Sequence, residues 1–166
     1  MQEAGTTAQR LAKQAIFSFH RADEAKGLEQ LAEAREKLLA GKKLIAHDPR
    51  LMGEGVWRAA LEEFCEASFF AKSVTGDDLF PPQDITEDTD ILLGALSDLV
   101  GEMVRVAVNA AIERDKAKVE GIYEQAVLLV EFILSMDLTG GLRSKADQAR
   151  QHLRRMEEIR YDLSKQ

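Results

Sequence analysis

The chain has 166 residues, of which 45% are hydrophobic and 31% charged, with 11 glycines and 3 prolines. This length suits one well-packed domain, and the abundance of Ala, Leu, Glu, Lys and Arg favours helices and excludes general disorder. The net charge of −7 argues against a surface that binds nucleic acid through bulk positive charge, although a local basic groove is compatible with it.

Helical periodicity extends over most of the chain. We expect Thr6 or Thr7 to cap a first helix that ends near Ala25, before a break at Gly27, and we expect a second helix to stop at His47-Asp48-Pro49. The predicted helices cover about 6–25, 28–46, 55–73, 89–114, 116–136 and 142–163, with one substantial loop over 75–88. No strand pattern or repeat appears. The sequence therefore predicts an all-α fold, a single domain over 1–166 that forms a bundle of six to seven helices.

Location is indicated by three features. The single cysteine, Cys65, excludes an intramolecular disulfide and fits a reducing cytoplasm. No basic and apolar leader opens the sequence, so secretion is not expected. The apolar run from Ile91 to Ile112 has the length of a membrane span, but charged residues near its middle make spanning costly. We expect a protein that does not enter the membrane.

The same apolar run carries one narrow polar stripe. Its members follow at spacings of four, three and four, and at about 100° per residue they share one side of a helix: Asp98, Glu102, Arg105 and Asn109. Carboxylates in a mostly buried helix need a partner, and a metal ion or an internal salt bridge to Arg105 are the two possibilities.

A second pair of acids, Glu63 and Glu66, shares one flank of the preceding helix. Antiparallel packing of the two helices would bring both pairs together, and four carboxylates demand a cation. Hard oxygen ligands point to Mg²⁺ or Mn²⁺ and to hydrolysis of a phosphate ester or anhydride. The alternative is that Glu63 and Glu66 are ordinary surface acids.

A family resemblance rests on three segments: Trp57-Arg58 leading into LEEFCEASFF, the central ILLGALSDLVGEMVRVAVNAAI, and the ending RRMEEIRYDLSKQ. Together they resemble the translin and Trax family of RNA-binding proteins, and IFSFHR is similar to the family's opening helix. The shorter chain, without a basic amino-terminal extension, favours a compact microbial homologue of archaeal type. The resemblance implies a translin-like all-α fold, an octameric barrel, and Mg²⁺-dependent endoribonuclease action on RNA enclosed in it.

Residue by residue, the Trax-type ribonuclease acids fall on Glu63 and Glu66 in LEEFCEA and on Asp98 and Glu102 in SDLVGE. We therefore expect these four to be catalytic residues and metal ligands. The expected partners are single-stranded or short duplex RNA, or single-stranded DNA, and further copies of the chain. Two alternatives stay open: an all-α nucleoside triphosphate pyrophosphohydrolase, suggested by Glu62-Glu63-Phe-Cys-Glu66, and a nucleic-acid-binding scaffold without catalysis.

The RNA-binding residues expected from the sequence are basic side chains of the first helix and one arginine of the polar stripe. On the first helix, such residues contact phosphate or simply form a solvated face. The candidates are Arg10, Lys13, His20, Arg21 and Arg105.

Overall fold

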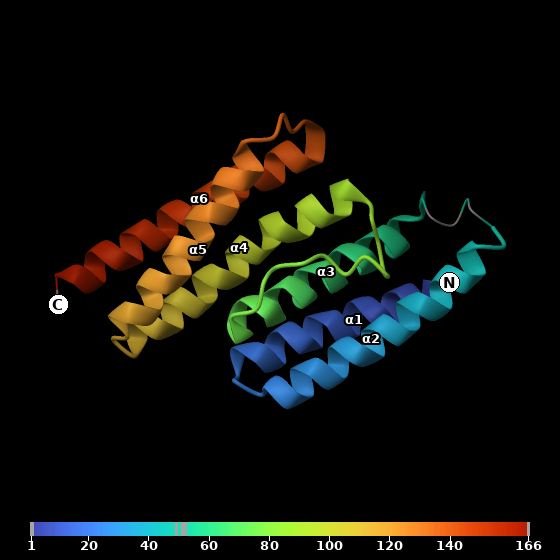
Figure 1. Ribbon diagram of the computed structural model, residues 1–166, viewed down its shortest axis with the longest axis horizontal. Coiled ribbons are helices and arrows are strands. Elements are labelled where there is room, and N and C mark those ends of the chain that lie inside the picture. Colours follow the sequence, from blue (N-terminus) through green and yellow to red (C-terminus); the bar gives the residue numbers. More distant parts are fainter. Residues whose placement is uncertain (1, 49, 51–52, 166) are drawn as a thin grey trace. The chain divides into compact units, whose positions relative to one another are not determined.

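The computed structural model describes residues 2–48, 50 and 53–165. Within these residues it contains six helices and no strand, which confirms the all-α fold. They are α1 (Gln2–His20), α2 (Glu24–Ile45), α3 (Gly55–Thr75), α4 (Thr89–Ile112), α5 (Lys116–Leu134) and α6 (Gly140–Ser164) (Figure 1). A search of these residues found no helix with the length and apolar character needed to cross a membrane.

The chain divides into two compact units, one ending at Ala95 and the other beginning at Leu96. The first contains α1, α2, α3, the 76–88 loop and the start of α4, and the second contains the rest of α4 with α5 and α6. The single domain expected over 1–166 stays a prediction.

In the first unit, α1 packs against both α2 and α3 (Figure 1). Glycines allow the close approach of these helices: a Cβ on Gly41 would lie 2.5 Å from the ring of Trp57, and one on Gly27 would lie 2.8 Å from the ring of Phe19. Gly27 is therefore a packing residue inside α2, where the sequence suggested a break.

The connection between α1 and α2 differs from the prediction. The helix α1 starts at Gln2, so Thr6 and Thr7 lie inside it, and it ends at His20. Ala22 turns the chain with a positive φ of 58°, and the side chain of Asp23 then caps α2 by accepting a hydrogen bond from the Lys26 amide. Pro49, to which the sequence assigned the end of the second helix, lies outside the described residues.

The 76–88 loop follows the left-handed Gly76 at the end of α3. Ile85 and Thr86 bury their side chains in the first unit. Asp88 then starts α4, because its carboxylate accepts hydrogen bonds from the amides of Asp90 and Ile91 and from the guanidinium of Arg58. The buried residues and the Asp88 cap thus fix the carboxyl end of the loop.

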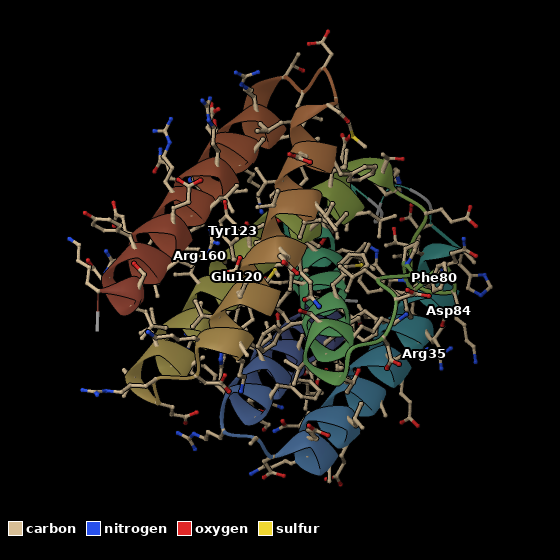
Figure 2. All side chains as sticks on the ribbon, turned by 60° about the vertical axis from the view of Figure 1, so that its left-hand side comes forward. Arg35, Phe80, Asp84, Glu120, Tyr123 and Arg160 are labelled. Atoms are coloured by element: carbon tan, nitrogen blue, oxygen red, sulfur yellow. The ribbon has the colours of Figure 1, made fainter. Side chains whose placement is uncertain are left out.

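The second unit has its own apolar core, in which Ala110 of α4 meets Val119 of α5 and Ile159 and Leu163 of α6. A polar clamp joins α5 to α6 beside it. Arg160 donates two hydrogen bonds to Glu120, at 2.7 and 2.5 Å, and its guanidinium lies 3.8 Å from the centre of the Tyr123 ring (Figure 2). This pairing fixes the register of the two helices.

Candidate functional site

The acids of α3 stand beside its buried face. Trp57, Phe64 and Ala67 fill the core of the first unit, while Glu63 and Glu66 are half-buried. The Glu63 carboxylate lies 3.4 Å from the ammonium of Lys13 on α1, and its side chain is 17% exposed. The Glu63 carboxylate therefore has limited access to water and lies next to the Lys13 ammonium.

The neighbouring Glu62 packs against the start of α4. Its carboxylate oxygens lie 3.0 and 3.2 Å from the position that a Cβ on Gly94 would take, so a side chain at position 94 would require the Glu62 carboxylate to shift by a few tenths of an ångström. Burial raises the pKa of the Cys65 thiol to about 12, and the negative charge of Glu62 contributes to the increase. Cys65 is therefore a protonated core thiol, which excludes it as a nucleophile.

The acids of α4 are also half-buried, and each has a basic partner in the second unit. The carboxylate of Asp98 accepts a hydrogen bond of 2.5 Å from the ammonium of Lys145 on α6. Glu102 pairs with Arg105 at 2.8 Å, as the salt-bridge interpretation of the stripe expects. Toward the end of the stripe, Arg105 and Asn109 are exposed. The stripe thus runs from half-buried acids to solvent.

Lys145 is a partner of the predicted acid Asp98 that the sequence did not indicate. The inward positions of α6 follow at spacings of four and three, and two of them are polar: Lys145, Ala149, His152, Met156, Ile159 and Leu163. A lysine and a histidine among buried apolar residues signal partners on a neighbouring helix. Lys145 meets Asp98, and the Nε2 atom of His152 lies 3.3 Å from the place of a Cβ on Gly101.

The predicted RNA-binding residues of α1 differ in their surroundings. Lys13 lies beside Glu63, and Arg10 is exposed and donates a hydrogen bond to Gln14. The ring of His20 is half-buried against Phe70, with 4.7 Å between the ring centres. Arg21 is exposed directly after the helix. An ion pair thus joins Lys13 to one of the predicted acids.

The donor set has the chemistry that Mg²⁺ prefers, because each helix offers two carboxylates one turn apart. The pair on α3 belongs to the first unit and the pair on α4 to the second. A search of the described residues found no group of three or more His, Cys, Asp or Glu side chains placed to hold a metal. The assignment of these acids as ligands therefore stays a prediction.

The described residues thus form an all-helical protein with a pair of half-buried acids on each of α3 and α4. The model of the Translin family matches residues 2–164, and the chain belongs to this family. The resemblance seen in the sequence is thereby confirmed. A comparison with curated proteins gave no match.

Solved structures with the same fold include three C3PO chains. Apo-NeC3PO has a TM-score of 0.89 and 17% identity, over 98% of this chain and 87% of that one. AfC3PO has a TM-score of 0.85 and 21% identity, over 98% and 86%. AfC3PO in complex with duplex RNA has a TM-score of 0.81 and 22% identity, also over 98% and 86%.

Proposed function

We propose that the protein is a Trax-type, Mg²⁺- or Mn²⁺-dependent endoribonuclease that cleaves single-stranded or short duplex RNA within a homo-octamer in the cytoplasm. The observation that carries the proposal is the half-burial of the candidate acids on α3 and α4, in a chain of the Translin family. A solved relative by fold, AfC3PO, is bound to duplex RNA, which supports RNA as the substrate class.

The proposed roles follow from the chemistry of the side chains. Glu63, Glu66, Asp98 and Glu102 would hold the ion, which when bound supplies positive charge to the reacting phosphate and activates water. Arg105 and Lys13 each lie next to one of these acids. Both can donate to phosphate oxygens of the RNA backbone, and Arg10, His20 and Arg21 would extend this contact along α1.

Further copies of the chain are supported by apolar residues that remain exposed in one copy. Leu128 and Phe132 are 69% and 51% exposed and lie one turn apart on α5. Large apolar side chains in this arrangement are typical of contact surfaces. A light-scattering mass of eight chains would support the octamer, and a monomer at micromolar concentration would contradict it.

A second function, RNA binding without catalysis, is favoured by the ion pairs. Lys13, Lys145 and Arg105 already neutralise Glu63, Asp98 and Glu102 with the chain's own cations. Carboxylates that are paired in this way stabilise helix packing without any metal. The stripe would then be structural, as the scaffold interpretation of the sequence holds.

One experiment distinguishes these functions. The purified protein is incubated with labelled single-stranded RNA, duplex RNA, single-stranded DNA and nucleoside triphosphates, each with Mg²⁺, with Mn²⁺ or with EDTA. We expect metal-dependent internal cleavage of RNA by the wild type and by the control Asp90→Asn, which changes an exposed acid of α4. RNA binding without cleavage would support the scaffold, and release of pyrophosphate would support the pyrophosphohydrolase.

Glu63→Gln, Glu66→Gln and Asp98→Asn should each abolish cleavage and keep the helical content and the assembly. Removal of a metal ligand lowers metal affinity much more than stability, since it also relieves repulsion between like charges. Unchanged cleavage by any of the three would remove that acid from the mechanism.

A further inference from the structure

A cavity of about 470 Å³ lies in the first unit, between α2, α3 and the 76–88 loop. Small-molecule sites in proteins typically have volumes of about 300–1,000 Å³. The cavity lies on the side of α3 that carries Phe64, Ser68 and Thr75, whereas Glu63 and Glu66 face away from that side at helical spacing. It is thus separate from the acids of α3.

Apolar side chains make up most of the lining. Leu31, Phe64 and Ala71 line the cavity together with Leu28 and Phe80. Two of these large side chains remain open to solvent, Leu28 with 53% and Phe80 with 66% of its surface exposed. When an apolar molecule covers such solvent-exposed apolar surface, the free energy falls, and this favours binding.

Two cations line the same cavity, Arg35 from α2 and Lys72 from α3. Arg35 binds Oδ2 of Asp84 through Nε at 2.8 Å and Nη2 at 2.6 Å, and Figure 2 shows this pair on the same side as Phe80. Lys72 donates to the carbonyl oxygen of Phe80 at 3.1 Å. Each cation keeps further N–H donors, because a guanidinium has five and an ammonium three.

Apart from the two cations and the Asp77 carboxylate, few polar groups in the lining are available to recognise a base or a sugar. The Ser68 hydroxyl donates to the carbonyl of Phe64 in its own helix, and the Thr75 hydroxyl is within 2.7 Å of the Asp77 carboxylate. A nucleobase placed here would leave polar edge atoms without partners, which is costly. The lining therefore favours an apolar body over a nucleotide.

We propose that this cavity binds a small amphipathic acid, an aromatic or branched aliphatic molecule with one carboxylate, sulfonate or phosphate. The apolar body would cover Phe64, Leu28 and Phe80, and the anionic group would bind Arg35 and Lys72. The anion would bind through the N–H donors of Arg35 that remain beside its ion pair with Asp84.

The test uses two fluorescent probes that differ by one charge. 8-Anilinonaphthalene-1-sulfonate has an apolar body and a sulfonate, and N-phenyl-1-naphthylamine has the same body without it. We expect the sulfonate to bind the wild type with one site in the first unit, located by amide chemical shifts of the 76–88 loop. Shifts confined to the exposed apolar residues of α5 would overturn the proposal.

Three variants separate the contributions. Arg35→Gln should weaken sulfonate binding about fivefold, the effect of about 1 kcal/mol for a partly exposed charge pair, and should leave the neutral probe unchanged. Lys43→Gln removes the same charge from an exposed position of α2 outside the cavity and should change neither probe. Ser68→Met should reduce the volume of the cavity and weaken both probes, with thermal unfolding checked in parallel. Equal effects of Arg35→Gln and Lys43→Gln, or full binding by a folded Ser68→Met, would overturn the proposal.

Discussion

The ion pair between Asp98 and Lys145 allows the proposed metal ligand to be tested separately from its structural role. The two side chains are each about one-third exposed, at 33% and 29%, and lie 2.5 Å apart. Exposed pairs contribute up to about 1 kcal/mol, and removal of one partner of a fully buried pair costs about 3–5 kcal/mol. We therefore expect a coupling of about 1 kcal/mol, well below the buried case.

The assay is a double-mutant cycle of Asp98→Asn, Lys145→Met and the combined variant, measured by urea unfolding with circular dichroism. RNA cleavage is measured on the same proteins as a function of Mg²⁺ concentration. Asp98→Asn should lose at least about a hundredfold in activity, because a ligand is removed. Lys145→Met should reduce the Mg²⁺ needed for half-maximal cleavage about fivefold, because about 1 kcal/mol of competition from the ammonium is gone.

Two results would refute this reasoning. If Asp98→Asn loses stability by several kcal/mol and the double variant recovers it, the pair is structural and the activity loss says nothing about metal binding. If Lys145→Met leaves the Mg²⁺ dependence unchanged while cleavage proceeds, the ammonium does not compete for the carboxylate. The control Asp90→Asn should match the wild type in both assays.

Three further outcomes are expected. Gly41→Ala should lower the free energy of unfolding by about 1–2 kcal/mol, because the new Cβ would meet a buried indole ring at 2.5 Å. Gly121→Ala, where a Cβ would point into open space, should raise the free energy of unfolding by about 0.5–1 kcal/mol, and equal thermal stability of the two variants would contradict the packing. Cys65, with a pKa raised to about 12, should resist thiol reagents at pH 8 until urea unfolds the chain, and rapid labelling of the native protein would disagree with its burial. Arg21→Ala should flatten the dependence of RNA affinity on salt more than Arg154→Ala, and the opposite order would place RNA on α6.

The number and order of the helices were predictable because long segments of helix-favouring residues alternate with short connections that contain Gly, Pro and Asp. The boundary between α1 and α2 was not predictable, for two reasons. Gly27 breaks a helix by propensity, yet here it makes room for Phe19 inside α2. Ala22, which adopts the left-handed turn with φ of 58°, has no sequence signature for that conformation.

The acids of α3 and α4 could be selected from the sequence because charged residues among apolar ones are visible without a structure. Their partners depend on how helices distant in sequence align. Asp98 and Lys145 are 47 positions apart, and the 2.5 Å contact between them requires a particular register of α6 on α4. Periodicity indicates which side of a helix is buried, but not the register of one helix on another.

Lys145 also shows how the two proposed functions differ physically. The Lys145 ammonium carries one positive charge and three N–H donors. This is enough to neutralise the Asp98 carboxylate, which is all that a structural role requires. A divalent ion gains by gathering several carboxylates, so it must displace such ammonium and guanidinium groups before it binds. An enzyme therefore binds Mg²⁺ against the competition of Lys13, Lys145 and Arg105, and then has those cations available for the phosphate. A scaffold keeps its ion pairs, and its stability does not change with the Mg²⁺ concentration.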